Sequence, residues 1–186
     1  MKQKKIVVFN GSPRTNGNTA KLVEAFEKGA KEAGHQVTVF DLTKRQIHPC
    51  LGCMQGGKNS EFPCVQRDGM TEIYPAFDEA DVMVWASPLY YWGISGQLKC
   101  TIDRLFALAE RDKREERKGA MAREIALLMT ADGNAFEDVE VWFEGLKDRS
   151  VQWKSVGKVL CGNLHGSDNM EGRPEIQQAY ELGKNI

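Results

Sequence analysis

A polar loop near the start of the chain carries the residue types best suited to chemistry, and that chemistry is the binding of an anion. The segment "GSPRTNGNT" (residues 11–19) follows a short apolar run and precedes a stretch with helical spacing. Its side chains would converge with the backbone N–H groups of a helix start, where the helix dipole favours negative charge. A terminal phosphate fits such a loop because its three oxygens accept many hydrogen bonds. The candidate donors are Ser12, Arg14, Thr15, Asn16, Asn18 and Thr19.

The loop differs from two common nucleotide-binding motifs. A Walker A loop needs Lys and then Ser or Thr after its last glycine, whereas Asn18 and Thr19 follow Gly17. The glycines do not form G-x-G-x-x-G either, so nucleoside triphosphates and dinucleotides are both disfavoured as ligands. An alternative stays open, in which Asn16 or Asn18 only caps the helix.

A second loop, "SPLYYWGISG" (residues 87–96), gathers three aromatic side chains, Tyr90, Tyr91 and Trp92. Flat rings and backbone N–H groups suit a flat heterocycle that is stacked on its face and hydrogen-bonded at its edge. The alternative is that the rings cover the sheet end or a subunit interface. A phosphate site and a ring site on neighbouring loops together indicate a mononucleotide with a planar base. Flavin mononucleotide (FMN) fits best, because its ribityl chain would span the two loops.

These loops need a scaffold, and the sequence predicts strands that alternate with helices. Such alternation is typical of an α/β fold with a parallel sheet covered on both faces. Ligands of these sheets bind beyond the carboxyl ends of the strands, so "TADGNAF" (residues 130–136) should face the same crevice as the first two loops. The expected strands are 4–10, 35–42, 81–88, 123–133 and 155–166, and the expected helices are 20–33, 70–80, 95–110, 134–148 and 173–186, with Pro75 kinking the second helix or delaying its start.

With "GSPRTNGNT", "CLGC", "SPLYYWGISGQLKCTIDR" and "AYELGK", the chain resembles the NAD(P)H-dependent FMN reductases of the flavodoxin-like superfamily. Within it, the chain is most similar to the iron–sulfur flavoprotein and multimeric flavodoxin branch. The resemblance implies a flavodoxin-like three-layer sandwich, with a five-stranded parallel sheet in the order 2-1-3-4-5. It also implies FMN as cofactor, NAD(P)H as electron donor, and a homodimer or homotetramer.

The resemblance further implies which residues hold the cofactor. The phosphate would bind Ser12, Arg14, Asn16, Asn18 and Thr19. The isoalloxazine would lie along Pro88, Leu89, Tyr90, Tyr91, Trp92 and Gly93, with Asp132 and Gly133 approaching its other side. No side-chain acid or base is required for electron transfer, so no catalytic residue is assigned.

Three cysteines form the pattern C-x2-C-x10-C at Cys50, Cys53 and Cys64. The similar iron–sulfur branch carries one more cysteine, where Gly56 stands here, and a [4Fe–4S] cluster usually takes four thiolates. Zinc held by these cysteines and His48 is an alternative. We expect reduced thiols without a metal.

Composition sets the remaining expectations. The 186 residues suffice for one domain over 1–186, and the net charge of -1 gives no long-range attraction to nucleic acid or to an anionic membrane. The apolar run at the N-terminus is too short for a signal peptide, so we expect a cytoplasmic protein whose partner is a small-molecule electron acceptor. His35 is expected to be structural, and His165 and the charge run 110–118 are expected to be exposed.

Three functions follow as hypotheses. The first is an oxidoreductase that passes electrons from NAD(P)H through flavin to a flavin, quinone or other small acceptor. The second is a flavodoxin-like electron carrier without a nicotinamide site. Balanced charge, with 25 basic and 26 acidic residues, favours the enzyme over an acidic carrier. The third is a metal-binding or redox-sensing protein that uses Cys50, Cys53 and Cys64.

Overall fold

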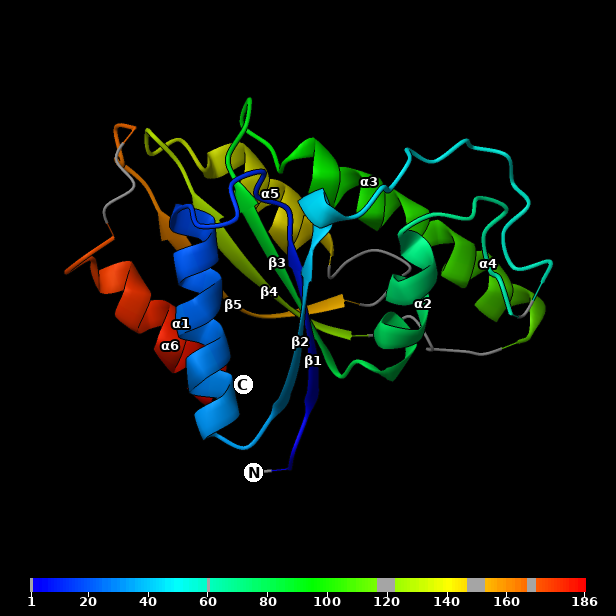
Figure 1. Ribbon diagram of the computed structural model, residues 1–186, viewed down its shortest axis with the longest axis horizontal. Helices are drawn as coiled ribbons and strands as arrows, with labels where there is room; N and C mark the ends of the chain where they lie inside the picture. Colours follow the sequence, from blue (N-terminus) through cyan, green and yellow to red (C-terminus); the bar gives the residue numbers. More distant parts are fainter. Residues whose placement is uncertain (1, 60, 117–122, 147–152, 167–169) are drawn as a thin grey trace.

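The computed structural model describes residues 2–59, 61–116, 123–146, 153–166 and 170–186, and a parallel five-stranded sheet forms its centre (Figure 1). The order across the sheet is β2-β1-β3-β4-β5, and all four neighbouring pairs are parallel. The predicted α/β fold and strand order are therefore confirmed. The strands are β1 (Lys5–Asn10), β2 (Gln36–Asp41), β3 (Val82–Pro88), β4 (Arg123–Thr130) and β5 (Trp153–Cys161).

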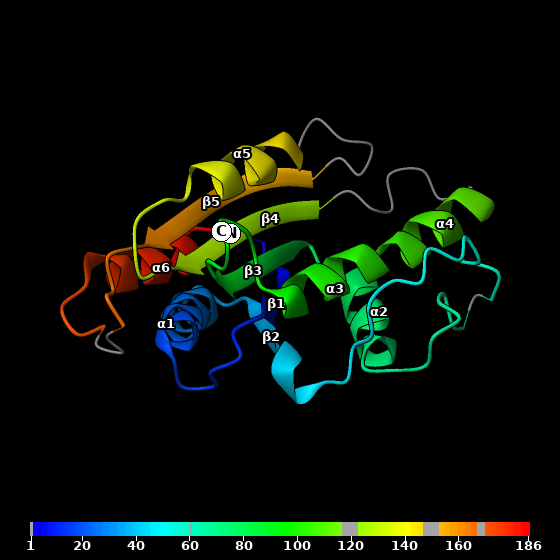
Figure 2. The same ribbon diagram turned by 90° about the horizontal axis from the view of Figure 1, so that it is seen from above.

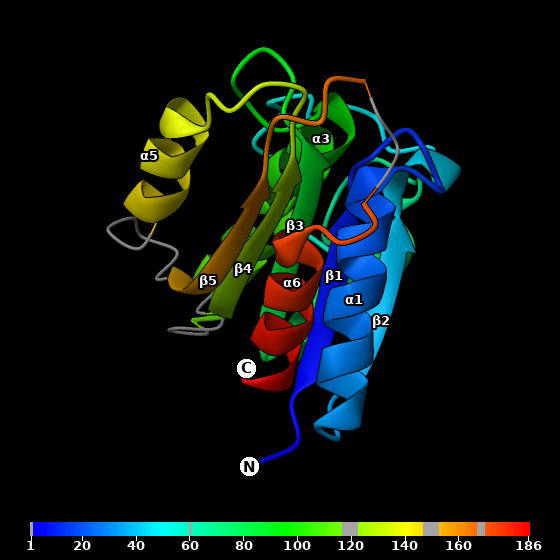
Figure 3. The same ribbon diagram turned by 90° about the vertical axis from the view of Figure 1, so that its left-hand side faces the viewer.

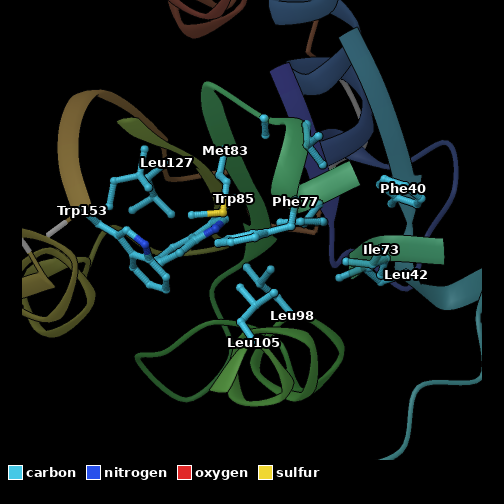
Figure 4. Packing of buried hydrophobic residues seen from close by; sticks show 14 of the residues in the cluster. Phe40, Leu42, Ile73, Phe77, Met83, Trp85, Leu98, Leu105, Leu127 and Trp153 are labelled. Carbon is cyan, nitrogen blue, oxygen red and sulfur yellow. The ribbon is translucent and has the colours of Figure 1, made fainter. Parts of the chain in front are cut away.

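The central strand β3 is buried along its whole length, as a strand covered on both faces must be. Val84 points into one core layer, whereas Met83 and Trp85 point into the other. The Trp85 ring meets the Trp153 ring edge to face, with centroids 5.1 Å apart (Figure 4). The apolar, β-branched sequence of this strand thus supplies both halves of the core.

Helices cover both faces of the sheet and make three layers (Figures 2 and 3). One face is covered by α1 (Asn18–Glu32) and α6 (Pro174–Lys184). The helices on the other face are α2 (Met70–Glu79), α3 (Gly96–Arg104), α4 (Phe106–Arg114) and α5 (Glu137–Gly145).

The first and last helices touch backbone to backbone. A Cβ atom added to Gly29 of α1 would collide with the Tyr180 carbonyl of α6, and one added to Gly183 would collide with the Phe26 carbonyl. Two glycines facing each other's helix therefore let α1 and α6 approach more closely than side chains would allow.

The helix predicted over 95–110 is instead broken at Leu105. The Leu108 N–H donates to the Leu105 carbonyl at 3.0 Å, three residues back rather than four. The Arg104 carbonyl, which a continuous helix would have used, accepts a hydrogen bond of 3.3 Å from the Tyr74 hydroxyl. A tertiary contact thus ends α3 and starts α4, which sequence periodicity alone cannot reveal.

Smaller differences concern element ends and one proline. Helix α2 begins at Met70 with Pro75 inside it, so the proline does not delay the start. Strand β4 stops at Thr130, and β5 runs from Trp153 to Cys161 rather than over 155–166. Helix α5 spans Glu137–Gly145, and residues 147–148 of the expected helix lie outside the described residues.

The charge run 110–118 is not wholly exposed as expected, and its residues 117–118 lie outside the described ranges. Arg111 and Asp112 are buried, because Arg111 pairs with Asp78 at 2.6 Å and with Asp112 at 2.8 Å. His35 is buried and accepts a hydrogen bond from the Lys4 N–H at its Nδ1, so its structural role is confirmed. Within the described ranges, no helix has the length and apolar character needed to span a bilayer.

Candidate functional site

The loops that follow β1, β3, β4 and β5 all lie at one edge of the sheet (Figure 3). Hydrogen bonds join neighbouring loops along this edge. The Leu89 N–H donates to the Thr130 carbonyl at 2.8 Å, and the Asn163 N–H donates to the Gly133 carbonyl at 2.7 Å. The convergence expected from parallel strands is therefore present, and it brings the predicted site residues to one region.

The loop between β1 and α1 is held in shape by its own side chains. The Ser12 N–H donates to Oδ1 of Asn10, and the Ser12 hydroxyl oxygen accepts from the Arg14 N–H, both at 3.2 Å. Asn10 is in turn fixed by its 3.0 Å hydrogen bond to Asp41. Burial would raise the pKa of Asp41, but hydrogen bonds from Lys44 and Asn10 hold it below its usual value. The charged Asp41 thus anchors the base of this loop.

The N-terminus of α1 carries no side-chain cap. Gly17 occupies the N-cap position without a side-chain hydrogen bond, and the first turn contains no acidic residue. The alternative that Asn16 or Asn18 is the N-cap is therefore wrong. Arg14, Thr15 and Asn16 are exposed around this helix end, whereas Asn18 and Thr19 are buried. A helix start with this donor set and no acidic residue in its first turn suits an anion.

Thr19 connects α1 to the carboxyl end of β4. Its hydroxyl lies 2.8 Å from the hydroxyl of Thr130, the last residue of β4. Both residues are buried. The first turn of α1 is thereby fixed relative to the loop that contains Asp132 and Gly133.

The aromatic loop forms a tight hairpin. The Tyr90 and Gly93 backbones exchange two hydrogen bonds of 3.0 Å, and the two residues between them have positive φ, 47° for Tyr91 and 58° for Trp92. This is the signature of a type I′ turn, which normally takes Asn and Gly. Bulky residues held in this conformation are under backbone strain, and such strain is common at functional sites.

The side chains of this hairpin face solvent. Tyr91 is 95% exposed, and Tyr90 and Trp92 are about half exposed. Pro88 and Leu89, which are also predicted to contact the flavin ring, precede the hairpin; Pro88 is buried as the last residue of β3, and Leu89 is half-buried. A cavity of about 240 Å³ adjoins the hairpin and is lined by Trp92, Gly93, Ile94, Lys99, Asp138, Val139 and Trp142.

Ser95 joins the aromatic loop to the anion loop, and the prediction did not include it. Its hydroxyl donates to the Gly11 carbonyl at 2.7 Å and accepts from the Leu98 N–H at 3.3 Å, which caps α3. A Cβ atom on Gly11 would lie only 2.6 Å from this hydroxyl, so the two loops are in direct contact. A serine before a helix signals a cap, but the contact with Gly11 is visible only in the folded chain.

The two predicted residues after β4 are exposed at the same edge. Oδ1 of Asp132 accepts from the Gly166 N–H at 2.9 Å, and the Asp132 carbonyl accepts from the His165 N–H. Asp132 therefore holds the loop after β5 in place. Gly133 has open space beside its α-carbon. His165 is exposed, as expected.

The three cysteines of the C-x2-C-x10-C pattern lie on the side of the sheet covered by α2, α3, α4 and α5. Cys50 and Cys53 are exposed and Cys64 is half-buried, and all three line one cavity of about 40 Å³. His48 does not line it; its Nδ1 lies 3.4 Å from Oδ2 of Asp68. Among the residues described, no group of three or more His, Cys, Asp or Glu is arranged to hold a metal ion. The four-ligand zinc set is therefore not assembled.

A buried ion pair contacts the loop that carries Cys50, Cys53 and Cys64 (the cysteine loop). Arg104 and Asp68, about 1% and 2% exposed, are joined by bonds of 2.6 and 3.1 Å. The Arg104 guanidinium also donates to the His48 carbonyl at 2.9 Å. Burial would raise the pKa of Asp68, but its hydrogen bonds to Arg104 and to two backbone N–H groups hold it below its usual value.

The chain is similar to one known protein family and to proteins named iron–sulfur flavoproteins. Residues 4–141 match the family described as NADPH-dependent FMN reductase. An iron–sulfur flavoprotein of Archaeoglobus fulgidus is 34% identical over 185 residues, which is 98% of this chain and 78% of that protein. An iron–sulfur flavoprotein of Methanocaldococcus jannaschii is 34% identical over 100 residues, 54% of this chain and about half (51%) of that protein.

Solved structures show the same fold. An NAD(P)H:quinone oxidoreductase from Methanothermobacter marburgensis superimposes with a TM-score of 0.75 at 21% identity, covering 99% of this chain and 96% of that one. An FMN-dependent NADH-azoreductase from Bacillus anthracis, in complex with FMN, gives a TM-score of 0.66 at 15% identity, covering 97% and 96% of the two chains. At these identities the likeness establishes the fold alone.

Proposed function

This chain belongs to the NADPH-dependent FMN reductase family, and from that premise we propose that it passes electrons from NAD(P)H through FMN to a small acceptor such as a flavin or a quinone. The cofactors are FMN and NAD(P)H. FMN, when bound, supplies the electron-transfer chemistry. The residues of the chain bind the cofactor, orient it and shape the space around it.

One observation carries the proposal: the uncapped start of α1 and the strained aromatic hairpin are bonded together through Ser95 and Gly11 at one sheet edge. This donor set fits FMN, because one end offers N–H and hydroxyl groups to a phosphate and the other offers flat rings and backbone N–H groups. We assign the phosphate to Ser12, Arg14, Asn16, Asn18 and Thr19. We assign the isoalloxazine to Pro88–Gly93, with Asp132 and Gly133 on its other side.

The cavity beside Trp92 supports a planar acceptor. Its walls are largely apolar and include two tryptophans, Trp92 and Trp142, while Lys99 and Asp138 add one charge of each sign. Flat apolar walls with a few polar groups favour a ring system such as a quinone over a protein partner. We therefore expect a small-molecule acceptor rather than an electron-transfer protein.

The decisive experiment uses the purified full chain with FMN added and excess removed. We expect a flavin absorption spectrum at about one FMN per chain, and rapid loss of the yellow colour on anaerobic mixing with NADPH or NADH. Adding a quinone should restore the colour. Bound flavin that neither nucleotide bleaches would indicate an electron carrier, and no uptake of FMN would refute the proposal.

Two variants test the phosphate assignment. Arg14→Ala should weaken FMN binding by about tenfold to a hundredfold, because a hydrogen bond to a charged group contributes about 1.5–3 kcal/mol. Lys28→Ala is the matched control, since it removes one positive charge from an exposed position farther along α1. Equal effects of the two variants on the Kd for FMN would overturn the assignment of Arg14.

A further inference from the structure

The names of the relatives imply an iron–sulfur cluster, and the cysteine loop of this chain does not fit one. A [4Fe–4S] cluster is held by four thiolates. Of the five cysteines, Cys50, Cys53 and Cys64 line the cavity of this loop. Cys161 is buried in the core layer on the opposite face of the sheet, and Cys100, on α3, does not line the cavity. The described residues therefore offer three thiols to the cavity, and the thioether of Met54 is not a usual cluster ligand.

The position of the missing ligand is closed by contact with α4. A Cβ atom on Gly56 would lie 3.0 Å from Cα of Ala107 and 3.1 Å from Cβ of Glu110. A Cβ atom on Gly57, whose φ is +69°, would collide with the backbone of Arg111. The loop backbone thus lies directly on the helix: a side chain at Gly56 would force its neighbours apart, and one at Gly57 would collide with the helix backbone.

Hydrogen bonds fasten the loop in this position. Arg114 donates from Nε to the Gly56 carbonyl at 3.0 Å, and the Gly57 N–H donates to the Pro63 carbonyl at 2.8 Å. These bonds join the middle of the loop to α4 and to the residue before Cys64. Moving the middle of the loop away from α4 to admit a cluster would break the Arg114–Gly56 hydrogen bond.

The volume of the cavity also argues against an iron–sulfur cluster. One water molecule needs a cavity volume of about 10–15 Å³. A cavity of about 40 Å³ therefore holds only a few waters. The eight inorganic atoms of a [4Fe–4S] cluster need more room. The three thiols nevertheless share this one small cavity.

We propose that Cys50, Cys53 and Cys64 form a thiol–disulfide site in place of an iron–sulfur cluster. Cys50 and Cys53 are exposed, and they are joined by a turn in which Gly52 has φ +60° and its N–H donates to the Cys50 sulfur at 3.5 Å. Cys64 is half-buried on the same cavity. An accessible cysteine beside a second one is the usual arrangement of a redox-sensitive thiol pair.

The oxidant is a low-molecular-weight disulfide. A thiolate of the site attacks one sulfur of that disulfide, a mixed disulfide forms, and one small thiolate leaves. A second cysteine of the site then attacks the mixed disulfide, the intramolecular S–S bond forms, and the second small thiol leaves. Two protein thiols are oxidised, one external disulfide is reduced to two thiols, and the two protons end on the departing thiols.

The first arm of the test asks whether a cluster forms. The full chain with FMN bound is incubated anaerobically with ferrous iron, sulfide and a reductant, and iron and acid-labile sulfide are then measured per chain. We expect no more of either than in a triple variant with Cys50, Cys53 and Cys64 replaced by Ser. Gly56→Cys, which supplies a fourth cysteine in the loop, should give the same result. Stoichiometric iron and sulfide in the unmodified chain would overturn the proposal.

The second arm exposes the protein to oxidised glutathione, followed by acid quenching, alkylation and peptide mapping. We expect two thiols to be lost and a disulfide between two of the three loop cysteines. Cys100→Ser is the control, because it removes a cysteine outside the cavity and should lose two thiols as well. Retention of every thiol, a bond to Cys100 or Cys161, or a bond between chains would each overturn the proposal. Flavin absorbance checks that each variant is folded.

Discussion

The Ser95 hydroxyl donates a 2.7 Å hydrogen bond to the carbonyl of Gly11, a residue 84 positions away in the chain. Ser95 also caps α3, so one side chain links a helix start, the aromatic loop and the anion loop. Relative placement of the two loops, rather than the donor set of either one, then decides whether a ligand can bridge them.

Replacing Ser95 with Ala should loosen both loops together. The lost cap should lower the free energy of unfolding by about 1–2 kcal/mol. FMN affinity should fall about fivefold to tenfold, because the ligand must then order the two loops itself. Chemical denaturation and fluorescence titration measure these effects. Ser155→Ala, near the amino end of β5, is the control and should change neither. A stable variant with unchanged affinity would show that Ser95 does not position the site.

The strained hairpin predicts that substitutions which relieve the strain will increase stability and weaken ligand binding. Replacing Tyr91 with Asn and Trp92 with Gly supplies the residues that a type I′ turn prefers. The free energy of unfolding should rise by about 1 kcal/mol as the positive-φ strain is relieved. The Kd for FMN and the KM for a quinone should both rise, because the flat side chains are gone. Single variants, compared by denaturation and steady-state kinetics, separate the two positions. A double variant less stable than the parent would contradict the strain argument.

The Arg104–Asp68 pair predicts how stability depends on pH. The pKa of Asp68 is held below its usual value, so its contribution is complete above the unfolded pKa, about 3.9, and is lost as the pH falls through the lower folded pKa. We expect the free energy of unfolding to decrease below about pH 4, and Asp68→Asn to lack this part of the decrease.

At neutral pH, Asp68→Asn should also cost about 3–5 kcal/mol, because it leaves a buried guanidinium without its counter-charge. Asp103→Asn removes the carboxylate of the exposed Lys99–Asp103 pair and should cost at most about 1 kcal/mol. Similar costs for the two variants would contradict a special role for burial.

The close contact between α1 and α6 predicts that a single methyl group added at Gly29 will destabilise the fold. Gly29→Ala should lower the free energy of unfolding by about 1–3 kcal/mol, because the added Cβ collides with the Tyr180 carbonyl. Gly145→Ala is matched to it, since the space beside Gly145 at the end of α5 is open. That control should be neutral or slightly stabilising. Thermal unfolding of both variants gives the comparison. A Gly29→Ala variant as stable as the parent would refute the close backbone contact between α1 and α6.

The sequence was sufficient to predict the sheet because β1, β3 and β4 contain short apolar runs, and the buried strand β3 carries that signal along most of its length. The site loops were predictable for the same reason: they had to follow those strands. What could not be predicted depends on contacts between distant residues. The break at Leu105 needs Tyr74, the burial of Arg111 needs Asp78, and the role of Ser95 needs Gly11. None of these pairs leaves a periodic trace in the sequence.

The glycine contact between α1 and α6 has a consequence for how the protein is made on the ribosome. Strand β1 and helix α1 emerge early, whereas α6, which packs against α1, is synthesised only after all five strands. Until then, Phe26 and its neighbours on α1 lack their partner and expose apolar surface. Nascent chains of this protein should therefore bind chaperones that recognise apolar segments, and release from them should coincide with the arrival of residues 174–184.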